Sequence, residues 1–398
     1  MTPRMRVGVD ATSWVNRRGY GRFARNAVGR LIELDPDATY LLYVDEPSAP
    51  AVDVPAGAEA VVVPVGQPQA GAAAAGSSRS VRDLLRLGRA VRSSGLDAFL
   101  FPSVYTYFPV LGVPTVVGVH DLIADTLPEL TFANRRTRGL WQLKERVAIR
   151  RARRLFTVSE SSRRAISARL GVEPGGLTVV PEAPAPVFFP RGDDRTAAEL
   201  KALGLGATEP FLLFAGGISP HKNLETLLDA FAAVRQSEAE PPRLVAVGDL
   251  ESDSFLSAAA AVKERVADLG LEGHVVFPGY VADETLASLY SAATAVVIPS
   301  LAEGFGLPAV EAAACGAPTV LSDLPAHRET LGDAALYFPP TDREELTRLL
   351  CRVIRDVELR RDLGQRGKRA VAGLSWDASA ERLRDLIREA AADGSGGS

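Results

Sequence analysis

The sequence is poor in the residues that build disulfide-stapled or metal-centred domains. Its 398 residues include only two cysteines, Cys315 and Cys351, and four histidines. Two cysteines cannot form a disulfide framework or a four-cysteine zinc site, and no histidine or cysteine cluster has the spacing of metal ligands. No apolar run approaches the roughly 18 residues that span a bilayer, and no signal-peptide pattern follows Met1. We therefore expect a cytoplasmic protein that needs no metal.

An excess of charge of one sign is also missing from the chain as a whole. Lys and Arg number 45 and Asp and Glu number 49, which gives a net charge of −4 and argues against a nucleic-acid binder. The exception is the segment 134–170, where twelve basic residues face two acids, Glu145 and Glu160. Three explanations of this basic segment are open. It forms a solvated helix face, it pairs with acids elsewhere in the chain, or it docks to anionic lipid at the inner face of a membrane or to another acidic surface.

Short β-branched runs alternate with amphipathic stretches along the chain. The expected strands of the first half are Arg6–Asp10, Thr39–Asp45, Ala60–Val63, Ala98–Phe101, Thr115–Val119, Leu155–Val158 and Leu177–Val180. Those of the second half are Phe211–Phe214, Leu244–Val247, Val275–Phe277, Ala295–Ile298, Thr319–Leu321 and Ala335–Phe338. One helix is expected over Gly21–Leu34. Such alternation predicts an α/β protein with two doubly wound, mostly parallel sheets.

The alternation breaks at a polar, turn-prone stretch near 186–195, which indicates a domain boundary. We expect a first Rossmann-like domain over 1–188, a second over 189–375, and a C-terminal helix over 376–398 that crosses back to the first domain and ends in a flexible tail. Ligands of doubly wound sheets bind at the carboxyl ends of the strands. The cleft between the two domains is therefore the expected site.

The most informative stretch is Pro299–Pro318, with the sequence PSLAEGFGLPAVEAAACGAP. A strand leads into a glycine loop, and Pro308 then marks a helix start. The loop and the following turn hold the candidate ligand-binding residues Glu303, Gly304, Phe305, Gly306, Leu307 and Glu311. Glycine amides beside a helix N-terminus suit a phosphate, and two carboxylates can accept hydrogen bonds from sugar hydroxyls. The alternative is that both glutamates only stabilise the helix dipole.

A second loop predicts the same kind of ligand. The strand Phe211–Phe214 is followed by the loop AGGISPHKN and a helix for which Asn223 is the expected N-cap. An ammonium group, glycine amides and a helix start converge in such a loop on an anion. The loop supplies the candidates Gly216, Gly217, Ser219 and Lys222. The Gly-Lys-Ser/Thr order of a P-loop is absent, and a plain surface lysine beside a turn is the alternative.

The first half contributes weaker candidates. Gly19 and Gly21 match a dinucleotide-binding fingerprint, but Gly19 follows the strand end at Asp10 by nine residues, so we interpret them as a loop that faces a diphosphate rather than a nicotinamide site. His120 directly follows a buried strand and should reach the cleft, where it could contact a sugar or carry a proton; a structural histidine is the alternative. His327 is expected at the surface.

Taken together, these motifs resemble family 4 of the retaining glycosyltransferases, which adopt the type B fold of two Rossmann-like domains. The resemblance covers nearly the whole chain. Its most specific part is the Glu-x7-Glu element from Glu303 to Glu311, supported by the loop Ser219–Asn223, by Val119–Asp121 and by Ser375-Trp376.

The resemblance implies transfer of a hexose from a nucleotide diphosphate sugar to an acceptor hydroxyl, with retained anomeric configuration and without a metal or other cofactor. Glu303 would contact the transferred sugar, Glu311 the ribose hydroxyls and Lys222 the diphosphate. Gly19 and Gly21 would approach the diphosphate, and His120 would orient the sugar. The second domain would bind the donor and the first a small-molecule, glycan or lipid-linked acceptor.

The sequence departs from the family pattern at two positions. Gly217 stands where many members have arginine, and Glu182-Ala183 replaces the usual Asn-Gly. The loop around Lys222 favours mannose or rhamnose donors within the resemblance. A nucleotide-sugar-binding protein without transferase activity and a type B sugar-nucleotide epimerase remain alternatives.

Overall fold

The computed structural model describes residues 4–16, 19–69, 80–192, 194–206, 209–248 and 258–395. The chain forms two compact units. Unit 1 comprises Met1–Glu182 and Ser375–Ser398, and unit 2 comprises Ala183–Leu374. Unit 2 is therefore inserted between two segments of unit 1.

Unit 1 is built on a seven-stranded parallel sheet in the order β3-β2-β1-β4-β5-β6-β7. Its strands are β1 (Arg6–Asp10), β2 (Thr39–Asp45), β3 (Ala58–Val63), β4 (Ala98–Phe101), β5 (Thr115–Gly118), β6 (Arg154–Thr157) and β7 (Leu177–Val179). Its α-helices are α1 (Gly19–Phe23), α2 (Gly29–Leu34), α4 (Val81–Arg92), α5 (Ile123–Thr126), α6 (Pro128–Thr131), α7 (Arg135–Arg151), α8 (Glu160–Leu170) and α17 (Trp376–Ser395). The buried apolar runs of β1, β4 and β5 match a sheet covered on both faces.

Two helices of unit 1 differ from what the sequence predicts. The expected single helix Gly21–Leu34 contains a π-helical turn at Ala24–Val28, which separates α1 from α2. The C-terminal helix α17 extends to Ser395, so that Gly394 and Ser395 of the expected flexible tail are helical, and the helix packs against α2, β4, β5 and β6. Its buried side chains include Leu383, Ile387 and Ala390. Residues 396–398 of the expected flexible tail lie outside the described part.

Unit 2 repeats the same topology with six parallel strands in the order β10-β9-β8-β11-β12-β13. The strands are β8 (Phe211–Ala215), β9 (Arg243–Val247), β10 (Val275–Gly279), β11 (Ala295–Ile298), β12 (Thr319–Ser322) and β13 (Leu336–Phe338). The α-helices are α9 (Asp194–Ala202), α10 (Leu224–Ser237), α11 (Ala259–Asp268), α12 (Asp283–Ala292), α13 (Leu307–Ala314), α14 (Pro325–Leu331), α15 (Arg343–Arg355) and α16 (Val357–Val371).

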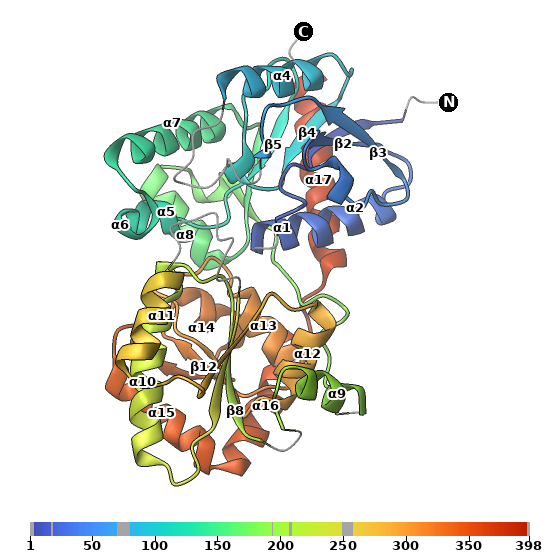
Figure 1. Cartoon of the computed structure of the whole chain (residues 1–398). Helices are drawn as coiled ribbons and strands as arrows, with labels where there is room; N and C mark the ends of the chain where they lie inside the picture. The colour runs from blue at the N-terminus through green and yellow to red at the C-terminus, as the bar shows by residue number, and fades with distance from the viewer. Residues whose placement is uncertain are drawn as a thin grey trace. The chain divides into compact units, whose positions relative to one another are not determined.

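The helices of unit 2 cover both faces of its sheet. On one face, α10, α11 and α15 share a core with the strands that includes Phe214, Leu228 and Leu350. On the other, α12 packs against α13 and α13 against α16 (Figure 1). The predicted fold class, two doubly wound α/β units, is confirmed. Among the described residues, none of the helices combines the length and apolar character required to cross a bilayer.

Candidate functional site

The site in unit 2 is placed by the strand order. Chain order reverses between the neighbouring strands β8 and β11, so the connections that leave their carboxyl ends diverge to opposite faces of the sheet. Doubly wound sheets bind ligands at such a point. The loop after β8 carries Lys222 and the loop after β11 carries Glu303. The topology therefore brings together two candidates that are 81 positions apart in the sequence.

Lys222 and Glu303 form a direct, largely buried ion pair. The Nζ atom of Lys222 lies 2.6 Å from Oε1 of Glu303, and the side chains are 17% and 8% exposed. The hydroxyl of Ser300 donates to the same carboxylate oxygen at 2.7 Å. Both charges can thus reach one bound molecule, as the sequence-based hypothesis requires, whereas the roles of the two residues remain predictions.

The surroundings of Glu303 decide its charge. Burial raises the pKa of its carboxyl group, but the attraction of Lys222 and His327 and the hydrogen bonds from Lys222 and Ser300 outweigh burial and lower the pKa to about 2. Glu303 is therefore ionised at neutral pH. A carboxylate in this state accepts hydrogen bonds from hydroxyl groups or stabilises positive charge, and it cannot act as a proton donor.

Asn223 joins the two loops that carry this ion pair. Its Nδ2 donates to the carbonyl of Pro299 at 3.0 Å and to that of Pro340 at 2.8 Å, and its Oδ1 accepts from Thr226 at 2.8 Å. Asn223 is the N-cap residue of α10, as predicted, but its side chain forms no capping bond and the residue is left-handed, with φ 55°. Asparagine tolerates this conformation, and its amide is used across the loops instead.

A backbone bond strengthens the same connection. The amide of Leu301 donates to the carbonyl of His221 at 2.8 Å, one residue before Lys222 and two before Glu303. The loops are thus held together by bonds that do not involve the ion pair itself. Such support fixes the two charges relative to each other before any ligand arrives.

His327 is the site residue that the sequence interpretation missed. Expected at the surface, it is fully buried in α14, and its Nδ1 lies 2.8 Å from the carbonyl of Ser322. Burial lowers its pKa, which leaves the ring neutral at neutral pH. Within the described part of the chain, its Nε2 has no hydrogen-bond partner. The flanking Arg328 and Glu329 make the segment look solvated, so no local signal marks this histidine.

Gly306 explains why His327 lies where it does. This glycine has φ +88°, and a Cβ atom built on it would lie 2.8 Å from Cδ2 of the His327 ring. The imidazole therefore packs directly against the backbone of the loop that carries Glu303. Only glycine satisfies both the left-handed conformation and the close approach.

The remaining unit 2 candidates surround the pair less directly. Ser219, Phe305, Leu307 and Glu311 are buried. The amide of Gly216 donates to Val247 at 3.0 Å, so it serves the sheet and is not free for an anion. Gly217 is partly exposed, and Gly304 lies in the loop beside Glu303. Their contacts with a donor remain predictions.

The three candidates of the first half lie in unit 1. His120 is buried, with Nε2 2.7 Å from the carbonyl of Pro102 and Nδ1 3.9 Å from Oε1 of Glu182. Burial lowers its pKa to about 4 in spite of the bond to Pro102. A neutral ring that donates Nε2–H to Pro102 keeps a lone pair on Nδ1. Glu182, one of the two departures from the family pattern, is thus a neighbour of this histidine.

Gly19 and Gly21 differ in the space that a side chain would have at each position. A Cβ on Gly21 would lie 2.0 Å from the carbonyl oxygen of Asn16, whereas a Cβ on Gly19 would meet no atom of the described residues within 4 Å. Gly21 is therefore required by the packing of its own loop. At Gly19 the described residues offer no packing reason for a glycine, and its approach to a diphosphate remains a prediction.

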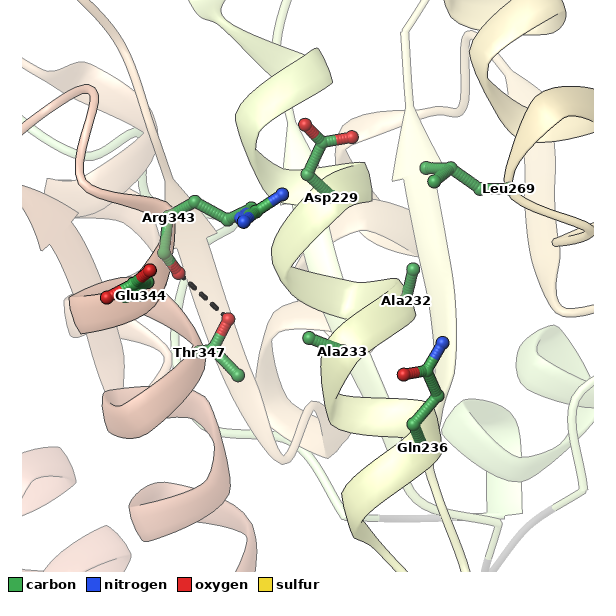
Figure 2. Close-up of a pocket in the computed structure, with 8 residues that line it drawn as sticks. All are labelled: Asp229, Ala232, Ala233, Gln236, Leu269, Arg343, Glu344 and Thr347. Atoms are coloured by element: carbon green, nitrogen blue, oxygen red, sulfur yellow. Dashed lines mark hydrogen bonds between the residues drawn. The ribbon is translucent and has the colours of Figure 1, made fainter.

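A groove elsewhere in unit 2 takes no part in this site. It lies between α10 and α15, and Figure 2 shows Asp229, Gln236 and Arg343 along it. Asp229 is already paired with Arg265 at 2.6 Å. None of the residues that line the groove is a predicted site residue.

Comparison with known proteins supports the family resemblance. The family described as "Glycosyl transferases group 1" matches residues 196–370, and "Glycosyltransferase Family 4" matches residues 17–183. A D-inositol 3-phosphate glycosyltransferase from Frankia alni is 32% identical over 283 residues, 70% of this chain and 69% of the relative. An MMP alpha-(1->4)-mannosyltransferase from Mycolicibacterium hassiacum is 32% identical over 71% of this chain and 67% of its own.

Other relatives are matched over a shorter share of their length. The chain spans 64% of the D-inositol 3-phosphate glycosyltransferase from Salinispora arenicola, at 30% identity and over 71% of this chain. Among solved structures, sucrose-phosphate synthase from Thermosynechococcus elongatus has a TM-score of 0.78 at 20% identity and covers 98% of this chain and 100% of its own. HepE from Anabaena, in complex with UDP and glucose, has a TM-score of 0.73 at 18% identity and covers 97% and 100%.

Proposed function

Because the chain belongs to glycosyltransferase family 4, we propose that it moves a hexosyl group from a nucleotide diphosphate sugar to an acceptor hydroxyl with retention of the anomeric configuration. The observation that carries the proposal is the ion pair of Lys222 and Glu303 at the point where the strand order of unit 2 reverses. One positive and one negative group, both fixed, suit a ligand that is part diphosphate and part sugar.

In this proposal Lys222 acts on the leaving group. As the bond between the anomeric carbon and the phosphate oxygen breaks, negative charge grows on the diphosphate. A fixed ammonium then stabilises the transition state more than the ground state. The loss of one such group typically lowers the rate on the order of 10²–10³-fold. No metal is required for this neutralisation.

Glu303 acts on the sugar. Its carboxylate is ionised, so it can accept from sugar hydroxyls and stabilise the positive charge that develops at the anomeric carbon. The acceptor oxygen attacks from the face that the phosphate leaves, and its proton passes to the departing phosphate oxygen. The less favoured alternative is that Glu303 attacks the anomeric carbon itself. A glycosyl adduct on Glu303 in mass spectra of acceptor-free reactions would select that alternative.

The other candidates complete the proposed donor site. Glu311 accepts from the ribose hydroxyls, and Gly217, Gly304 and Gly306 approach the phosphates. Unit 2 binds the donor and unit 1 binds the acceptor, with His120 orienting the transferred sugar. The neutral state of His120 favours hydrogen bonding to a hydroxyl over pairing with a phosphate.

The sugar is proposed to be of the mannose or rhamnose type. The loop Ser219–Asn223 supports this assignment, as do relatives described as an MMP alpha-(1->4)-mannosyltransferase and as O-antigen chain mannosyltransferase B of Escherichia coli. The acceptor is a small molecule, a glycan or a lipid-linked glycan.

The test is a donor screen followed by matched variants. Thermal shifts with UDP-, GDP-, ADP- and dTDP-sugars identify the donor, and nucleotide release is then measured with EDTA present throughout. We expect Lys222→Ala to weaken donor binding and Glu303→Ala to abolish transfer while nucleotide affinity is kept. Lys263→Ala, at an exposed lysine of α11, is the control.

The outcomes separate the alternatives. Donor binding without nucleotide release would indicate a binding protein, and conversion of the donor without acceptor would indicate an epimerase. Near-normal transfer by Glu303→Ala would refute the role of that carboxylate. A rate that vanishes in EDTA and returns with added divalent metal would refute the metal-free mechanism.

A further inference from the structure

Helix α7 of unit 1 presents an outward face that combines arginine with exposed leucine. Leu140 and Leu143 are 53% and 60% exposed, and Arg136, Arg146 and Arg150 are exposed on the same face. Positions 136, 140, 143 and 150 recur at intervals of three, four and seven, which places them on one stripe of a helix. The opposite face is buried through Trp141, Glu145 and Ala148.

The six arginines of this helix share the lack of an ion-pair partner among the described residues. Several exposed arginines of unit 2 do pair with acids of their own helix, such as Arg195 with Glu199 at 3.0 Å and Arg348 with Glu345 at 2.6 Å. By contrast, none of the six arginines of α7 forms an ion pair with a described residue. The list is Arg135, Arg136, Arg138, Arg146, Arg150 and Arg151.

The only acid of α7 does not offset this charge at the surface. Glu145 is 2% exposed. Burial and the neighbouring carboxylates of Asp125 and Asp121 raise its pKa to about 8, against the attraction of Lys144. The exposed face of α7 thus carries basic and apolar side chains but no acid, and of the three explanations for the basic segment, pairing with acids elsewhere among the described residues does not hold for this helix.

We propose that the exposed face of α7 docks the protein to an anionic lipid bilayer. Arginine attracts acidic head groups, and leucines interspersed among arginines can enter the boundary between head groups and acyl chains. Arginine alone would suit any acidic surface, whereas the two leucines among the arginines add apolar contacts that a bilayer can satisfy and an acidic polymer cannot. The combination favours a membrane surface.

Vesicle binding by the full-length protein tests the proposal. Sedimentation with vesicles of phosphatidylcholine alone is compared with vesicles that contain phosphatidylglycerol at 100 mM salt. Each basic residue near an anionic surface strengthens binding about five-fold, so the triple variant R136Q/R146Q/R150Q should bind about 100-fold more weakly. R195Q/R348Q/R361Q removes the same charge from three exposed arginines of unit 2, of which Arg361 lies on α16, and should bind like the unmodified protein.

A second variant separates lipid from other acidic partners. L140S/L143S keeps every charge, and we expect its vesicle binding to fall at least several-fold and its binding to heparin to stay unchanged. Both α7 variants should retain their melting temperature because the changed side chains are exposed. Equal binding to both vesicle types, unaltered binding by R136Q/R146Q/R150Q, or unaltered vesicle binding by L140S/L143S would each overturn the proposal; the last would point to an acidic polymer.

Discussion

The hydrogen bonds of the Asn223 side chain, which connect the loops that carry Lys222 and Glu303, allow a quantitative test of the site. Asn223 makes three side-chain hydrogen bonds, to Pro299, Pro340 and Thr226, at 2.8–3.0 Å. At about 1 kcal/mol of net stabilisation for each bond, their loss costs about 3 kcal/mol. Alanine adds about 1 kcal/mol more, because it lacks the short polar side chain whose local hydrogen bonding lets asparagine tolerate the left-handed conformation at φ 55°.

These numbers predict a graded series. Thr226→Ala loses one bond and should destabilise by about 1 kcal/mol, Asn223→Gly by about 3 and Asn223→Ala by about 4. For a unit of 150–250 residues each kcal/mol lowers the melting temperature by about 2–4 °C. In thermal unfolding, Thr226→Ala should therefore melt about 3 °C lower and Asn223→Ala about 12 °C lower.

Activity provides the second measurement. The bonds of Asn223 hold together the loops that carry Lys222 and Glu303. If these loops move apart in Asn223→Ala, kcat should fall on the order of 10²-fold, since a displacement of about 1 Å in an active site has effects of that size. Thr226→Ala leaves both bonds between the loops intact and should keep kcat. Equal melting temperatures for Asn223→Ala and Thr226→Ala, or full kcat in Asn223→Gly, would refute the reasoning.

Two further predictions concern the packed glycine and the buried histidine of unit 1. Gly306→Ala should destabilise unit 2 by more than about 2 kcal/mol and abolish transfer, because the added methyl group meets His327 at 2.8 Å in a left-handed conformation; unchanged thermal unfolding would contradict this. The pKa of His120 is lowered to about 4 from 6.5, so the folded state binds its proton less tightly than the unfolded chain does. Its stabilisation is complete above pH 6.5 and is lost as pH falls towards 4, by about 3 kcal/mol in all. Urea unfolding at several pH values measures this loss, and in His120→Asn the free energy of unfolding should depend less steeply on pH between 6.5 and 4.

The sequence was sufficient for the architecture, because parallel strands buried on both faces leave continuous β-branched runs. Every expected strand is present, with ends shifted by at most two residues, as for Ala60–Val63, which begins at Ala58. Glycine-rich sequences after two particular strands also indicated the loops that carry Lys222 and Glu303. The pattern predicted that both loops leave the carboxyl ends of parallel strands, whereas the pairing of β8 with β11, which makes the two loops neighbours, comes from the structure.

Side chains whose role comes from packing between distant segments were not predictable. His327 is separated from Gly306 by a strand, and nothing in its neighbours indicates burial. Asn223 looked like an ordinary helix cap, because its partners Pro299 and Pro340 come from other loops. The π-helical turn at Ala24–Val28 likewise left no mark on the apolar stripe of its helix.

The insertion of unit 2 into unit 1 has a consequence for synthesis on the ribosome. Unit 2 is one continuous segment, whereas the core of unit 1 needs Leu383 and Ile387 from α17, which are made last. At about 5–20 residues per second, roughly 10–40 s pass between the completion of β7 and the emergence of that helix. Unit 1 is thus synthesised first but completed last. During this delay the apolar surface that α17 later covers is exposed to chaperones.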